Sequence, residues 1–190
     1  MFKKQKKSFI NSRILKLLFF SPLLISIPFF SNHNNLKAGL EFQWDSGKGY
    51  KRLNWFQTDD KRRARNSIFF FFRPSDRKTG LLKINIKIPK TFKTTLKEEK
   101  ISFCKVLIGG FDTRTKCLEN IPADIELNED KKSLDIFPYA PIPYDKNSYA
   151  VVLKVFNPIM SGLYQFHSFG EAIGSTAVPI YLGSWTIVID

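Results

Sequence analysis

The chain has 190 residues, with 30 Lys and Arg against 17 Asp and Glu, and a formal net charge of +13 at pH 7. Residues 1–38 hold six Lys, one Arg and no acidic residue, so residues 39–190 hold 23 basic and 17 acidic residues and carry +6. This moderate charge argues against a nucleic-acid partner. Two His and two Cys in the whole chain argue against the usual zinc sites, and we expect no metal and no cofactor.

The first 38 residues have the pattern of an export signal. Five basic residues precede an apolar stretch at 14–30, and a polar step then leads to a small residue, Ala38. This order is typical of a secretory signal peptide, so we predict cleavage after Ala38 and a mature domain at 39–190. The alternative is a membrane anchor at 14–30, although the apolar run Leu17–Phe30 is shorter than the roughly 20 residues of a spanning helix.

The remaining residues predict one all-β domain. Short β-type segments alternate with turn residues, and only residues 94–100 look helical. The expected strands are residues 41–44, 50–56, 67–73, 82–88, 101–108, 124–127, 134–137, 150–156, 163–169 and 184–189. Many short strands with frequent turns favour a single antiparallel β-sandwich over an α/β fold.

Residues 82–88 predict a strand with one wet face, because Leu and Ile alternate with Lys and Asn. The side chains expected to face the core are Leu82, Ile84, Ile86 and Ile88, and those expected to face water are Lys83, Asn85 and Lys87.

Residues 68–72 are different, because Ile68, Phe70 and Phe72 point to one face of a strand and Phe69 and Phe71 to the other. Both faces are therefore apolar. We expect the segment Trp44–Trp55 to cover the second face, with a partner or membrane surface as the alternative.

Three motifs together resemble an exported cyanobacterial family of unknown function. They are Asn157-Pro158 with the following Ser161–Phe166, the aromatic strand Ile68–Phe72 with Leu81–Ile86 and Pro89, and Leu182-Gly183 before Trp185. The resemblance runs from about residue 40 to 190. It implies export and an all-β domain, and it assigns no catalytic residue because the family has no assigned activity. The basic stretch Lys61–Arg65 and the Cys pair have no counterpart in the family pattern.

Only His167 in the mature chain could serve a Ser–His–Asp triad, and no Gly-x-Ser-x-Gly motif accompanies it. We interpret His167 as a residue on the outer face of a strand, with a hydrolase as the alternative. The series Asp124, Glu126, Asn128, Asp130 and Asp135 has the spacing of a calcium loop. Glu129 occupies the position where that loop requires Gly, so we interpret the series as an edge strand and a turn.

The densest basic cluster after the signal consists of Lys61, Arg62, Arg63 and Arg65. Arg binds sulfate, phosphate and carboxylate in bidentate fashion, so the cluster is a candidate anion site; a solvated loop is the alternative. We interpret the chain as an exported, non-enzymatic accessory protein of the cell envelope. Its candidate partners are an anionic envelope polymer or a membrane surface, and a protein partner is unknown.

The two cysteines, Cys104 and Cys117, predict a disulfide across a hairpin, since an exported chain meets an oxidising environment. If Gly110 and Phe111 are the centre of a two-residue turn, the two Cys face each other as a non-hydrogen-bonded pair. Two reduced thiols are the alternative.

Overall fold

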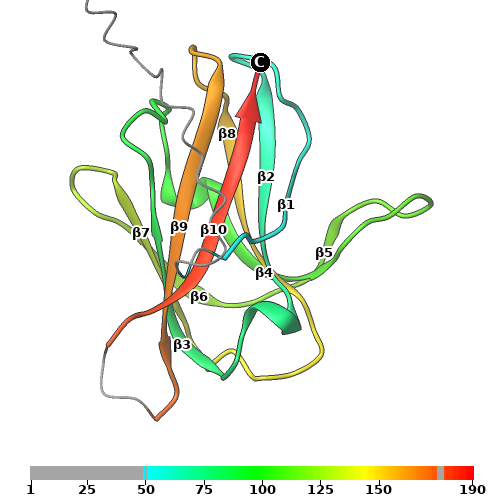
Figure 1. Cartoon of the computed structure of the whole chain (residues 1–190), viewed down its shortest axis with the longest axis vertical. Coiled ribbons are helices and arrows are strands. Elements are labelled where there is room, and N and C mark those ends of the chain that lie inside the picture. The colour runs from blue at the N-terminus through cyan, green and yellow to red at the C-terminus, as the bar shows by residue number, and fades with distance from the viewer. Residues whose placement is uncertain (1–48, 50, 175–177) are drawn as a thin grey trace, which may run out of the picture. The chain divides into compact units, whose positions relative to one another are not determined.

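The computed structural model describes residues 49, 51–174 and 178–190, and they fold into two five-stranded sheets (Figure 1). The predicted signal peptide, the cleavage point and the expected strand at 41–44 lie outside these residues. Every pairing between the named strands is antiparallel, so the predicted antiparallel β-sandwich is confirmed. In the described residues there is no helix long and apolar enough to cross a membrane.

The first sheet has the order β1-β2-β8-β4-β5 and the second has the order β10-β9-β3-β7-β6. The strands of the first sheet are β1 (Trp55–Gln57), β2 (Arg65–Phe72), β8 (Tyr149–Phe156), β4 (Ile101–Leu107) and β5 (Lys116–Asn120). Those of the second sheet are β10 (Ile180–Ile189), β9 (Gly162–Ala172), β3 (Leu81–Lys87), β7 (Ser133–Pro138) and β6 (Ala123–Leu127). Two short 3-10 turns complete the fold, η2 (Pro74–Asp76) and η3 (Glu98–Lys100).

The main core lies between the two sheets. Ile68, Phe70 and Phe72 of β2 are fully or almost fully buried, as their alternation predicts. Phe70 stacks on Trp185 of β10, with ring centroids 4.5 Å apart, and meets Phe166 of β9 at 4.8 Å. Aromatic pairs of this kind add to the free energy gained by burying their area, so they hold the two sheets together.

A second, smaller cluster lies on the other face of β2 and of its sheet neighbours β8 and β4. Phe71 is 2% exposed and packs with Val106, Ala150 and Val152, beside the disulfide. The cover predicted from Trp44–Trp55 is wrong for Trp55, which packs against the main core, and Trp44 lies outside the described residues. The apolar outer face of β2 thus continues across β8 and β4 of the same sheet.

Two expected elements differ from the structure. Leu82 is 43% exposed and Leu81 is buried, because a bulge between Leu81 and Lys83 changes the register with β9. The rest of the predicted alternation in β3 is present. Residues 94–100, which were expected to be helical, form only the single 3-10 turn Glu98–Lys100. The rest of this segment is a loop between β3 and β4.

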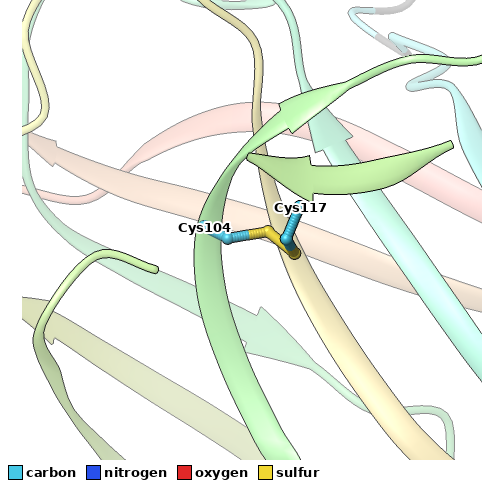
Figure 2. The surroundings of a disulfide bond; sticks show 2 residues. All are labelled: Cys104 and Cys117. Atoms are coloured by element: carbon cyan, nitrogen blue, oxygen red, sulfur yellow. A yellow bond between two sulfur atoms is a disulfide. The ribbon is translucent and has the colours of Figure 1, made fainter. Parts of the chain in front are cut away.

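The predicted disulfide is present between Cys104 and Cys117, with Cα atoms 5.7 Å apart (Figure 2). The predicted register is wrong. Gly110 N donates to Thr113 O at 2.9 Å, so Phe111 and Asp112 form the tip of the loop. Cys117 is therefore opposite Val106, and a bulge after Lys105 places Cys104 opposite Asn120. The diagonal pair still falls within the about 4.4–6.8 Å that a disulfide accepts.

Candidate anion-binding groove

The predicted basic cluster lies on a turn between β1 and β2 that two buried asparagines hold in place. Asn157 donates from Nδ2 to the carbonyls of Asp59 and Lys61, at 3.1 and 2.8 Å. Its Oδ1 accepts from Asn66 Nδ2 at 2.9 Å. Both side chains are 3% exposed, so these hydrogen bonds are shielded from water. The Asn157-Pro158 motif therefore has a structural role, because it fixes the turn that carries Lys61, Arg62 and Arg63.

The structure divides the predicted cluster. Lys61, Arg62 and Arg63 are exposed on the turn, where Arg63 adopts a left-handed backbone with φ 59°. The backbone N of Arg62 donates to Asp190 O, which places this turn beside the last described strand. Arg65 begins β2 instead, and its guanidinium lies 5.6 Å from the centre of the Phe156 ring.

Arg65 joins three lysines in a groove of about 620 Å³ on the outer face of the first sheet. The groove is lined among others by Arg65, Ser67, Lys97, Lys100, Lys154 and Phe156. Ser67 and Lys154 are direct neighbours across β2 and β8, and Arg65 is the neighbour of Phe156. Thr94 donates to the carbonyl of Phe156 at 2.6 Å, which fastens the β3–β4 loop at the rim.

The charges of this groove are all positive. Within the described part of the chain, no Asp or Glu lines it. Arg65, Lys100 and Lys154 take part in none of the salt bridges found there, and Lys97 has only a long contact of 3.9 Å with Glu99, both well exposed. Exposed pairs of this kind contribute little. Among the described residues, Arg65, Lys100 and Lys154 thus have no ion-pair partner and can pair with an anionic ligand, beside uncharged donors and one aromatic ring.

The lysines of this groove were not found from the sequence. Lys154 interrupts the apolar run 149–155, and a lone Lys in a buried strand marks an outward position. Lys97 and Lys100 fell in the segment expected to be helical. Only the pairing of β2 with β8 and the return of the β3–β4 loop bring them to Arg65.

The other candidate residues lie apart from the groove. His167 is half-buried on the outer face of β9, and its Nδ1 lies 2.7 Å from the Oγ of Ser184. Burial lowers the pKa of His167. Ser184 itself is 0% exposed, so no substrate reaches this hydroxyl from solvent in the folded state.

The acidic series is distributed over separate contacts. Asp124 accepts from the hydroxyl of Tyr139, Asp130 pairs with Lys132, and Asp135 pairs with Lys83. Residues 123–127 form strand β6 and the chain then turns, as predicted. Among the described residues, no group of three or more metal-ligating side chains gathers.

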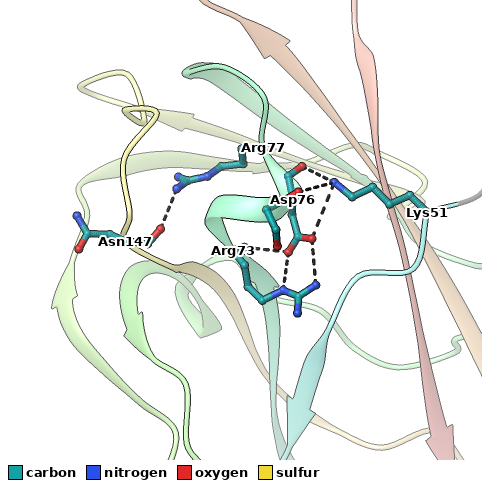
Figure 3. A network of polar contacts seen from close by, with 6 residues as sticks. Lys51, Arg73, Asp76, Arg77 and Asn147 are labelled. Carbon is teal, nitrogen blue, oxygen red and sulfur yellow. Dashed lines mark hydrogen bonds and ion pairs between the residues drawn. The ribbon is translucent and has the colours of Figure 1, made fainter.

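A polar network at the opposite ends of β2 and β8 anchors the connections there (Figure 3). Asp76 of η2 accepts from Arg73 Nε at 3.0 Å, and its carbonyl accepts from Lys51 at 2.7 Å. Burial lowers the pKa of Lys51, and the hydrogen bond to Asp76 raises that of Arg73.

The fully buried side chain of Arg77 belongs to the same region. It donates to Asn147 O at 2.8 Å and to Asp145 Oδ1 at 3.2 Å, and it lies 4.5 Å from the centre of the Tyr149 ring. These contacts join the chain after η2 to the start of β8, so the network has a structural role.

The Asp145 carboxylate should make stability depend on pH. Burial opposes its ionisation, but hydrogen bonds from Asn147, Tyr149 and Arg77 hold the pKa of Asp145 below its ordinary 3.8. The unfolded chain therefore binds the proton first, so this contribution is complete above about pH 5 and is lost as the pH falls below the ordinary value. We expect Asp145→Asn to lower the urea midpoint at about pH 6 and to have little effect at about pH 2. An equal loss at both pH values would contradict the expectation.

Comparisons with known proteins find solved structures that are similar to this chain. It is similar to BslA, described as a bacterial hydrophobin, at 12% identity over 73% of this chain and 97% of that one, with a TM-score of 0.47. It is similar to a collagen-binding domain of a Staphylococcus aureus adhesin, at 13% identity, 72% and 95% coverage and a TM-score of 0.38. It is also similar to ACE19, the collagen-binding subdomain of the Enterococcus faecalis surface protein ACE, at 11% identity. That match covers 73% of this chain and 97% of that one, with a TM-score of 0.40.

No curated protein matches the sequence. The family match covers nearly the whole domain that the structure describes. Since residues 42–189 match the family described as "Protein of unknown function (DUF2808)", the chain belongs to that family.

Proposed function

We propose that this chain is an exported, non-enzymatic accessory domain of the cell envelope that binds an anionic polymer through the basic groove. The groove is the observation that carries the proposal: four cations from β2, β8 and the β3–β4 loop line one recess without an acidic residue among the described ones. Carboxylate and sulfate groups along a polymer match such a row of cations by charge-assisted hydrogen bonds.

A polymer fits this recess better than a membrane surface does. Arg65 and Lys154 line a recess, and Arg65 lies beside the Phe156 ring. A single polymer chain can enter a groove and contact its walls. The exposed Lys61, Arg62 and Arg63 then add long-range attraction, which salt screens.

The disulfide supports an extracytoplasmic location, because such bonds form and persist in oxidising compartments. The buried hydroxyl beside His167 supports a non-enzymatic role. A panel of hydrolase substrates, tested on the wild type and on His167→Ala, separates a binding protein from an enzyme. Turnover of a substrate by the wild type that disappears in the variant would show that the protein is a hydrolase.

Binding to dextran sulfate and to polygalacturonate tests the proposal, with phosphatidylglycerol vesicles as the competing surface. A hydrogen bond to a charged group contributes about 1.5–3 kcal/mol, so Arg65→Glu with Lys154→Glu should weaken polymer binding at least about tenfold. Exposed charges contribute little to folding, so the melting temperature should change little.

The matched control is Lys61→Glu with Arg62→Glu, which makes the same change of charge outside the groove. We expect it to weaken binding at low salt only, and by less than the groove variant. An equal loss of affinity in the two variants would show that binding depends on the overall charge and not on the groove. Binding to the vesicles but to neither polymer would show that the ligand is a membrane surface.

A further inference from the structure

A second recess, of about 530 Å³, lies on the outer face of the other sheet. It forms where β3, β7 and β9 are neighbours, and Pro179 lies at its border. The residues that matter for its chemistry are Lys83, Asn85, Asp135, Phe169 and Glu171. We call it the polar hollow. It shares no lining residue with the basic groove, and the two recesses open on different sheets.

The polar groups of the hollow hold one another in fixed positions. Lys83 Nζ lies 3.2 Å from Asp135 Oδ1 and 3.9 Å from Glu171 Oε1. Asn85 Nδ2 donates to Asp135 Oδ1 at 2.7 Å. The side chains of Lys83, Asp135 and Glu171 are still 22–29% exposed, so a ligand can reach their remaining donors and acceptors. The hollow therefore presents both kinds of hydrogen-bonding group in a set geometry.

An aromatic surface lies beside these polar groups. Phe169 is half-buried on the outer face of β9 and lies 5.6 Å from Tyr181, measured between ring centroids. The hydroxyl of Tyr181 lies 2.6 Å from Ser184 Oγ, which is also the partner of His167. The buried Ser184 hydroxyl thus holds Tyr181 in place against Phe169. The two rings are therefore ordered before any ligand binds.

The charges of the hollow cancel. Two lysines, Lys83 and Lys87, are matched by two carboxylates, Asp135 and Glu171. An anionic ligand would meet both carboxylates, and a cationic one would meet both lysines. A neutral ligand rich in hydroxyl groups avoids either repulsion and can use both the donors and the acceptors.

We propose that the polar hollow binds a neutral sugar chain. A pyranose ring offers hydroxyl groups at its edge and C–H groups on its face, which match the fixed polar groups and the Phe169 ring respectively. The site is separate from the basic groove and does not depend on the function proposed for it. A domain with both sites can hold an acidic and a neutral polymer on different sheets.

Electrophoresis in native gels that contain dextran, galactomannan, xylan or hydroxyethyl cellulose tests this site. We expect at least one of these neutral polymers to retard the wild-type protein. Phe169→Leu keeps an apolar side chain but removes the flat ring, and Asp135→Asn removes one charge with little change in shape. Each should raise the dissociation constant for that polymer about tenfold, which corresponds to the loss of one aromatic contact or of one hydrogen bond to a charged group.

The control is Tyr144→Leu, which removes an aromatic ring that is 66% exposed and lies outside both recesses. It should bind the neutral polymer as the wild type does. Thermal unfolding of each variant confirms that it is folded, and Phe169→Leu should keep its binding to dextran sulfate. Retardation by none of the four polymers, or an equal loss in Tyr144→Leu, would overturn the proposal while leaving the basic groove untouched.

Discussion

Removing the Cys104–Cys117 disulfide should lower the free energy of unfolding by about 3 kcal/mol, because a bond that closes a short loop restricts the unfolded chain. The two residues are 13 apart in sequence. Cys104 is also fully buried in the cluster with Phe71 and Val106, so the bond fastens β5 to a strand that belongs to this cluster. For a domain of this size the loss corresponds to roughly 6–12 °C in melting temperature.

Urea unfolding of the wild type, with and without reductant, and of the Cys104→Ala, Cys117→Ala double variant checks this expectation. The reduced wild type and the double variant should unfold at similar, lower midpoints, and reductant should not affect the variant. A midpoint that stays the same when the bond is removed would show that the hairpin is stable without it.

Asn157→Ala should lower the free energy of unfolding by a similar amount, roughly 3 kcal/mol. Each buried polar group that is left without its hydrogen-bond partner costs about 1–3 kcal/mol of stability. The variant removes the partner of Asn66 Nδ2 and of the carbonyls of Asp59 and Lys61. The carbonyl partners are near the surface and can bind water in part, so the losses do not add fully.

Asn54→Ala is the matched control, since Asn54 is an exposed residue of the same type. Surface changes of this kind usually stay within about 0.5 kcal/mol. Chemical unfolding of both variants gives the two costs directly. An Asn157→Ala variant as stable as Asn54→Ala would mean that the β1–β2 turn does not depend on this side chain.

The fold could be predicted because its signals are local. Alternation in β3 and the aromatic run of β2 identify buried strands, and each predicted strand within the described residues has a counterpart there. The disulfide followed from two cysteines and a short hairpin. Its register did not, because a loop tip that shifts by one residue and a bulge after Lys105 change which residues are opposite. Neither has a clear signal in the sequence.

The candidate site could be predicted only in part. Arg65 was identified from a run of basic residues, but its neighbours Lys97, Lys100 and Lys154 are distant in sequence. Pairing between β2 and β8 brings Lys154 to Arg65, and such long-range pairing is not encoded in any short segment. The same holds for the polar hollow, where Asn85, Asp135 and Glu171 come from three strands.

Nuclear magnetic resonance titration of the labelled domain with a short sulfated dextran tests the central claim most directly. The account predicts chemical-shift changes at Arg65, Ser67, Lys97 and Lys154, which line the basic groove. The polar hollow around Asp135 and Phe169 should stay unaffected by this anionic ligand. Shift changes confined to Lys61, Arg62 and Arg63, or none at saturating ligand, would contradict a binding site in the groove.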